Sequence, residues 1–89
     1  SYAEISKHIL KQSNKVFSTS IGDNCFIGAG VCILAGTILG KQCIVGTNSV
    51  VRGEFPDYSV IVGSPAKIVK RYDTTQKVWR KTDASGNFL

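Results

Sequence analysis

The stretch from residue 21 to residue 56 divides into six consecutive hexapeptides: IGDNCF, IGAGVC, ILAGTI, LGKQCI, VGTNSV and VRGEFP. Their first residue is always aliphatic, the second is glycine in four of the six, and the fifth is of modest size except at Phe55. A period of six fits neither an α-helix, which repeats every 3.6 residues, nor an amphipathic strand, which alternates. It indicates short strands joined by tight corners, as in a solenoid.

This period predicts a triangular coil of three hexapeptides, so that residues 18 apart stack at the strand spacing of about 4.8 Å. We expect the first and fifth side chains to point inward, where the space near a corner admits only modest volume. Glycine at the second position is expected to permit the strained backbone and the close approach that a corner needs. The expected stacked pairs are Ile21 with Leu39, Ile27 with Val45, and Ile33 with Val51.

The three cysteines are Cys25, Cys32 and Cys43, and the first and last of them are also 18 residues apart. The spacing therefore predicts that Cys25 and Cys43 stack inside the coil. No CxxC occurs and the chain has one histidine, which argues against a zinc site. We expect buried, reduced cysteines that act as small core residues, and a cytoplasmic protein.

Length and composition limit the size and the setting of the fold. The chain has 89 residues, of which 43% are hydrophobic and 19% charged, a composition that folds. The longest uncharged run, residues 24–40, contains four glycines and is too short and too rich in glycine to span a membrane. The hexapeptides complete only two coils and end at the turn signal Pro56-Asp57, so we expect upstream coils, tight oligomerisation, or both.

The segments on either side of the repeat differ from it. Residues 1–20 are expected to form an excursion loop, although Ser1 and Glu4 resemble a helix capping box. Residues 21–72 are expected to form the coils and the basic segment that follows them. Residues 73–89 are expected to form a short hairpin or an extended tail, with Trp79 packed on the prism or a neighbour and fraying after Asp83. Six of the eleven cations lie between Lys67 and Lys81.

The repeat, followed by NSVV at 48–51, PDYSVIVGSPAKIVKRYD at 56–73 and a tail with tryptophan, resembles the hexapeptide-repeat acetyltransferases. The branch that O-acetylates sugars in lipopolysaccharide and capsule biosynthesis is the most similar. The resemblance implies an all-β fold, a left-handed parallel β-helix with an N-terminal loop segment and a C-terminal extended tail. It also implies a homotrimer with acetyl-CoA between subunits and a sugar hydroxyl as acceptor.

The same resemblance implies a coenzyme site built from corners of the coils and from the basic segment. Its expected members are Phe26 beside the pantetheine, Ala29 and Thr47 at corners, Arg52 and Gly53 at a pair that is commonly Thr-Lys, and Lys67 and Lys70 near the adenosine phosphates. CoA carries roughly four negative charges, which gives the basic segment a partner. Gly53 lacks the lysine that is usual at its position, and no metal is implied.

The catalytic base is where this sequence departs from the family pattern. The pattern places a histidine, acting as general base, immediately before residue 1, because Tyr2, Glu4, Ile9 and Gln12 match the members that follow it. The resemblance therefore implies a chain that is truncated just after its catalytic histidine. His8, the only histidine in the chain, is the weaker candidate.

Two other functions stay open at this point: a transferase with a non-sugar acceptor, such as an amino-acid hydroxyl or an amine, and a non-catalytic solenoid used for assembly. Binding of nucleic acid by the basic tail is disfavoured, because the sequence has no RNP, KH or helix-turn-helix signature.

Overall fold

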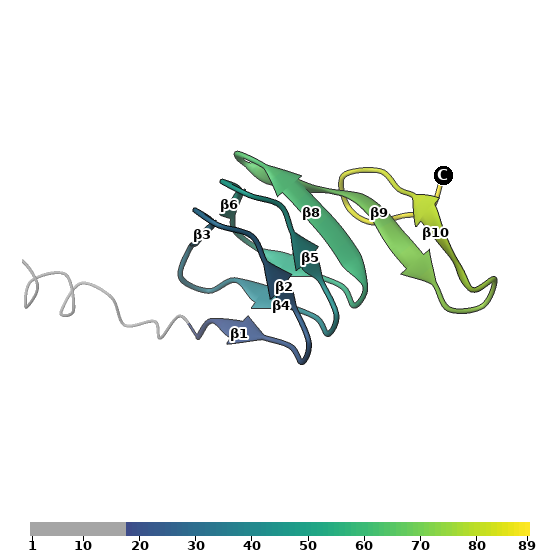
Figure 1. Cartoon of the computed structure of the whole chain (residues 1–89), viewed down its shortest axis with the longest axis horizontal. Coiled ribbons are helices and arrows are strands. Elements are labelled where there is room, and N and C mark those ends of the chain that lie inside the picture. Colours follow the sequence, from purple (N-terminus) through teal and green to yellow (C-terminus); the bar gives the residue numbers. More distant parts are fainter. Residues whose placement is uncertain (1–17) are drawn as a thin grey trace, which may run out of the picture.

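The computed structural model of the protein describes residues 18–89, and every regular element in this range is a β-strand (Figure 1). The first seven strands are two residues long: β1 Ser20–Ile21, β2 Phe26–Ile27, β3 Cys32–Ile33, β4 Ile38–Leu39, β5 Ile44–Val45, β6 Val50–Val51 and β7 Glu54–Phe55. Three longer strands follow: β8 Ser59–Gly63, β9 Ala66–Asp73 and β10 Val78–Lys81.

Strands one coil apart pair in parallel and form the three sides of a prism. The sides are β1-β4-β7, β2-β5-β8 and β3-β6, which amount to two full coils and two sides of a third. The predicted ladders are confirmed by the registers, which join Ile21 to Leu39, Ile27 to Val45, and Ile33 to Val51. Ile21 stays 48% exposed and Ile27 36% exposed, because in the described residues no coil lies beyond β1–β3.

The third coil begins two residues early, which corrects two predictions. Phe55 does not hold a fifth position: it pairs with Leu39, a first-position residue, 16 rather than 18 residues away. The cause is the connection between β6 and β7, where two residues replace the four that join β3 to β4. The repeat therefore does not end at Pro56-Asp57, since β8 continues the coil and pairs Ile61 with Val45.

The core follows the first and fifth positions of the hexapeptides, as predicted. Leu39, Val45 and Val51 are fully buried, together with the fifth-position Thr37, Cys43 and Ser49. Each fifth-position hydroxyl donates to the second-position carbonyl of its own corner, Thr37 to Leu34 O at 2.6 Å and Ser49 to Gly46 O at 2.7 Å. These bonds let small polar side chains occupy an apolar interior without an unsatisfied group.

The cysteines are free thiols, and two of the three lie where the spacing predicts. Cys43 is buried and Cys25 partly buried, and their Sγ atoms donate to the carbonyls of Pro56 and Gly40. Burial raises the pKa of the Cys43 thiol. The expectation that all three are buried is wrong for Cys32, which is exposed. It holds a sixth position, between an inward fifth and an inward first, and therefore points outward.

The second-position glycines serve close approach and not backbone strain, so that prediction is half wrong. A Cβ on Gly22 would lie 2.6 Å from the carbonyl carbon of Gly40, and one on Gly28 would lie 2.8 Å from the nitrogen of Thr47. Neither glycine has a positive φ. The left-handed residues hold the fourth position of each corner instead, with φ between 54° and 85°: Asn24, Gly30, Gly36, Gln42, Asn48 and, in the shifted third coil, Tyr58.

The chain reverses after β8 and extends one side of the prism into a five-stranded sheet, in the order β10-β9-β8-β5-β2. Both new pairings are antiparallel, and of the two forms expected for the tail the structure has the hairpin. Fraying after Asp83 does not occur, because the Asp83 carboxylate accepts hydrogen bonds from the backbone N–H groups of Ser85 and Asn87 at 3.0 and 2.9 Å. The bond from Asn87 is the largest cause of the lowered pKa of Asp83.

Candidate functional site

The outward face of the five-stranded sheet holds two of the seven predicted site residues in one line. The registers join, strand by strand, Phe26 to Ile44, Val60, Lys70 and Lys81, which we call the outer row. Directly opposed residues lie on the same face of a sheet, so these five side chains share one surface. Phe26 is 67% exposed at one end and two lysines stand at the other. The row is thus an apolar strip that ends in cations.

A second group of predicted site residues lies at one end of the strands of the same sheet, where the chain turns from β2 to β3 and from β5 to β6. Ala29 and Thr47 hold equivalent positions in the two coils, and the N–H of Asn48 donates to the Ala29 carbonyl at 2.9 Å. Lys67 pairs with Val62 at the same end of the strands. All three predicted residues at this corner are exposed. The corner therefore presents them together, beside the outer row.

Arg52 and Gly53 lie elsewhere. They form the short connection from β6 to β7, at the third corner of the prism. Gly53 has a φ of 107°, and a Cβ there would meet nothing within 4 Å. The structure thus brings five of the seven predicted residues to one sheet and its edge, and within one chain it does not bring Arg52 and Gly53 to them.

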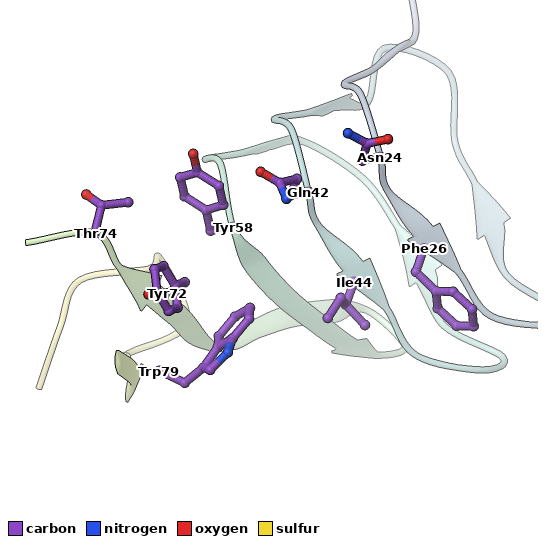
Figure 2. Close-up of a pocket in the computed structure, with 8 residues that line it drawn as sticks. All are labelled: Asn24, Phe26, Gln42, Ile44, Tyr58, Tyr72, Thr74 and Trp79. Carbon is purple, nitrogen blue, oxygen red and sulfur yellow. The ribbon is translucent and has the colours of Figure 1, made fainter. Parts of the chain in front are cut away.

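A hollow of about 580 Å³ opens on the same face (Figure 2). Of the predicted site residues only Phe26 borders it; the others around it are Asn24, Gln42, Ile44, Tyr58, Tyr72, Thr74 and Trp79. Asn24, Gln42 and Tyr58 stand in a row because each is the left-handed residue of its corner. The sequence does not predict Tyr58 or Tyr72 beside this hollow. Tyr58 could have been found only by recognising the shift of the third coil, which puts it at a fourth position.

Three of these aromatic residues contact one another edge to face. The ring centroids of Tyr58 and Tyr72 are 6.2 Å apart at an interplanar angle of 68°, and those of Tyr72 and Trp79 are 5.4 Å apart at 70°. Trp79 thus packs on the prism through Tyr72, as the sequence predicts. The ammonium of Lys70 lies 6.0 Å from the centre of the Trp79 ring. We call Tyr58, Tyr72 and Trp79 the aromatic cluster.

The carboxylate of Asp73, near this face, is already engaged. Asp73, at the end of β9, pairs with Arg80 at 2.9 Å and accepts the N–H groups of Thr75 and Gln76. The N–H of Gln76, followed by the Arg80 hydrogen bond, lowers the pKa of Asp73. Within residues 18–89 Lys67, Lys70 and Lys81 form an ion pair with no carboxylate. Their charge is available to an anion.

The sequence profile described as the hexapeptide repeat of succinyl-transferase matches residues 18–52. Residues 18–52 belong to the hexapeptide-repeat family. This match covers the first two coils, and the third coil and the hairpin lie beyond it.

Two curated relatives extend the similarity beyond the repeat. WbbJ of Escherichia coli, named as a lipopolysaccharide biosynthesis O-acetyl transferase, is 49% identical over 61 residues, which cover 68% of this chain and 31% of WbbJ. A Mycobacterium tuberculosis protein named as an acetyltransferase is 52% identical over 50 residues, which cover 56% of this chain and 17% of that protein. The hexapeptide-repeat chain therefore spans less than a third of the length of either relative.

A solved structure shows the same architecture. The serine acetyltransferase of Neisseria gonorrhoeae superposes with a TM-score of 0.64 and 33% identity, over 73% of this chain and 26% of that one. The fold is thus the left-handed parallel β-helix of the hexapeptide-repeat family, as the resemblance implied.

Several expectations fall on other parts of the chain. His8, Tyr2, Glu4, Ile9 and Gln12 lie outside the described residues. In residues 18–89 no three histidine, cysteine or carboxylate side chains group where they could hold a metal ion. No helix in that range is long and apolar enough to cross a membrane.

Proposed function

We propose that the protein to which this chain belongs transfers an acetyl group from acetyl-CoA to a sugar hydroxyl in the synthesis of a surface polysaccharide. The outer row carries the proposal, because its apolar stretch suits a pantetheine arm and its lysines suit phosphates. The similarity to WbbJ supports both the donor and the acceptor class.

The reaction needs little from the coils beyond placement. The acceptor oxygen forms a bond to the thioester carbonyl carbon, the bond from that carbon to sulfur breaks, and the hydroxyl proton passes to a general base. We place this base on a histidine immediately before residue 1 rather than on His8, and we place the acceptor site against residues 1–20. Residues 21–72 hold the coenzyme, and residues 73–89 form the C-terminal tail.

A homotrimer fits the separation of the predicted residues. Arg52 and Gly53 lie at a different corner from Ala29 and Thr47, so the seven residues converge only when two prisms meet corner to corner. We propose coenzyme sites between subunits, each using two corners from neighbouring chains. The three free thiols favour a reducing compartment, and we place the protein in the cytoplasm.

A second acceptor class has its own support. The similarity to a serine acetyltransferase structure, at 33% identity, favours an amino-acid hydroxyl as the alternative acceptor. Both acceptors share one donor site, so a test of CoA binding applies to either.

The test is calorimetric binding of CoA to the full chain, with the mass measured by light scattering in the same sample. We expect a trimer that binds CoA, with affinity lowered by salt and by Lys67→Glu or Lys70→Glu. Lys41→Glu is the matched control, because Lys41 lies over Tyr58 and off the outer row. A monomer that ignores CoA at every ionic strength would refute the proposal and leave the assembly role.

Acceptor identity needs the longer protein. Release of free thiol from acetyl-CoA, measured with sugars and with serine in turn, separates the two classes. His8→Gln should leave this activity intact if the base lies before residue 1, and should abolish it if His8 is the base.

A further inference from the structure

We propose that Trp79 is a stacking platform for the adenine base of the coenzyme, framed by Lys70 and Lys81. This inference rests on the proposed function. It extends the site from β9 to β10, which lies beyond the hexapeptide repeat.

The indole of Trp79 is both fixed and accessible. Trp79 lies opposite Tyr72 in the hairpin and is 46% exposed. Its neighbour in the aromatic cluster meets it at 70° and not face to face, so Tyr72 does not stack on the indole. Figure 2 shows the indole directed over the sheet toward Ile44, along the hollow. A ring held in this way needs little ordering when a flat ligand binds.

The charges beside the ring specify what kind of flat ligand fits. Lys70 and Lys81 are directly opposed in the sheet, and the Lys70 ammonium lies 6.0 Å from the indole centre. Like charges placed opposite each other destabilise a sheet, and a bound anion relieves that repulsion. A half-exposed aromatic ring beside two cations without a carboxylate partner in residues 18–89 matches a nucleotide, whose base stacks while its phosphates pair.

The outer row connects this platform to the rest of the site. From Phe26 to Lys81 the row crosses four strand spacings, about 19 Å at the usual separation. Ile44 and Val60 line the path between them. A coenzyme whose pantetheine lies beside Phe26 and extends across the strands reaches the hairpin with its nucleotide end.

Trp79 is the only tryptophan in the chain, so intrinsic fluorescence reports on this ring alone. The full chain is titrated with CoA, adenosine 3′,5′-bisphosphate and pantetheine. We expect saturable quenching by CoA and by the bisphosphate, and none by pantetheine at the same concentrations. Quenching by CoA and pantetheine alike, or by neither nucleotide ligand, overturns the inference.

Substitution supplies the second measurement. Trp79→Ala should weaken CoA binding by about 5- to 150-fold, the range of base–aromatic stacking. Trp79→Phe should retain most of the affinity, which separates stacking from loss of the fold. Val78→Ala is the matched control, because Val78 is similarly exposed on the same strand. Unchanged CoA binding by Trp79→Ala refutes the platform.

Two further outcomes distinguish a failure of this inference from a failure of the proposed function. If the bisphosphate quenches Trp79 but CoA does not bind, the nucleotide site stands and the proposed function fails. If Trp79→Ala loses CoA binding only because its mass by light scattering falls from trimer to monomer, the ring covers a second copy of the chain and the platform is refuted.

Discussion

Ser49→Ala tests how the coils are joined to the turn that carries Lys67. Ser49 is 1% exposed, and its hydroxyl makes two hydrogen bonds: it donates to Gly46 O at 2.7 Å and accepts the Gly63 N–H at 3.1 Å. The second bond links the second coil to the end of β8, immediately before the turn to β9. Alanine keeps the Cβ and removes both bonds.

The expected loss follows from the partners that remain. Gly46 O still accepts the backbone N–H of Ser49 at 3.3 Å, whereas the N–H of Gly63 loses the hydroxyl to which it donates. Each lost bond is counted at the usual net value of about 1 kcal/mol. We expect Ser49→Ala to lower the free energy of unfolding by about 2 kcal/mol. Ser59→Ala, equally buried but with one hydroxyl bond to Pro56 O, should cost about 1 kcal/mol.

Urea unfolding followed by Trp79 fluorescence measures both variants. The slope m should match that of the wild type, so that the shift in midpoint gives the free-energy difference directly. In thermal unfolding the midpoint should fall by about 8–16 °C for Ser49→Ala and about half as much for Ser59→Ala. An equal or larger loss in Ser59→Ala would show that the bond to Gly63 contributes nothing, and would refute the reasoning.

Three further outcomes are expected. Gly28→Ala should destabilise the fold and weaken CoA binding, because its Cβ would lie 2.8 Å from the backbone nitrogen of Thr47; unchanged melting would contradict the close packing of the coils. Because the folded-state pKa of Asp73 is lowered, the stability it contributes is present above its ordinary value of 3.8 and is lost as the pH falls through the folded value. The difference in melting temperature between wild type and Asp73→Asn should therefore shrink as the pH falls below 3.8, and a constant difference would contradict the pairing. Titration with a thiol reagent should find Cys32 reactive in the native protein, Cys43 protected, and three free thiols after denaturation without reductant; a single free thiol would refute the assignment.

The repeat made much of the prism predictable. Side chains that recur every six residues report directly which positions are inside, so the ladders from Ile21 to Val51 follow from the sequence. The shift of the third coil does not, because Val51 begins a sixth hexapeptide that looks regular. The size of Phe55, too large for a fifth position, is the one local sign of the shortened connection. The left-handed residues were expected at the wrong position because glycine suits both close approach of the backbone and a positive φ. At the fourth position the residue is often not glycine, as at Asn24, Gln42 and Asn48.

The site was predictable only where resemblance supplied it. Phe26, Ala29, Thr47, Lys67 and Lys70 come from a family pattern, and the structure then shows that they share one sheet and its edge. The aromatic cluster could not be foreseen, since Tyr58 and Trp79 are 21 residues apart and meet only because the hairpin continues the sheet. Composition identified the basic segment, but it could not show which of the cations in that segment form an ion pair with a carboxylate, as Arg80 does with Asp73.

The reversal of the chain at the end of β8 fixes one end of the prism. A parallel solenoid admits another coil at either end, whereas the antiparallel β9 and β10 stop that growth on one side. The separations along the prism axis from Lys67 to Thr47, and from Thr47 to Ala29, are fixed by the spacing between strands. A coil gained or lost N-terminal to β1 would alter the end of the prism opposite the hairpin and leave these separations unchanged. The architecture therefore separates a constant end, beside the hairpin, from an end that is free to vary in length.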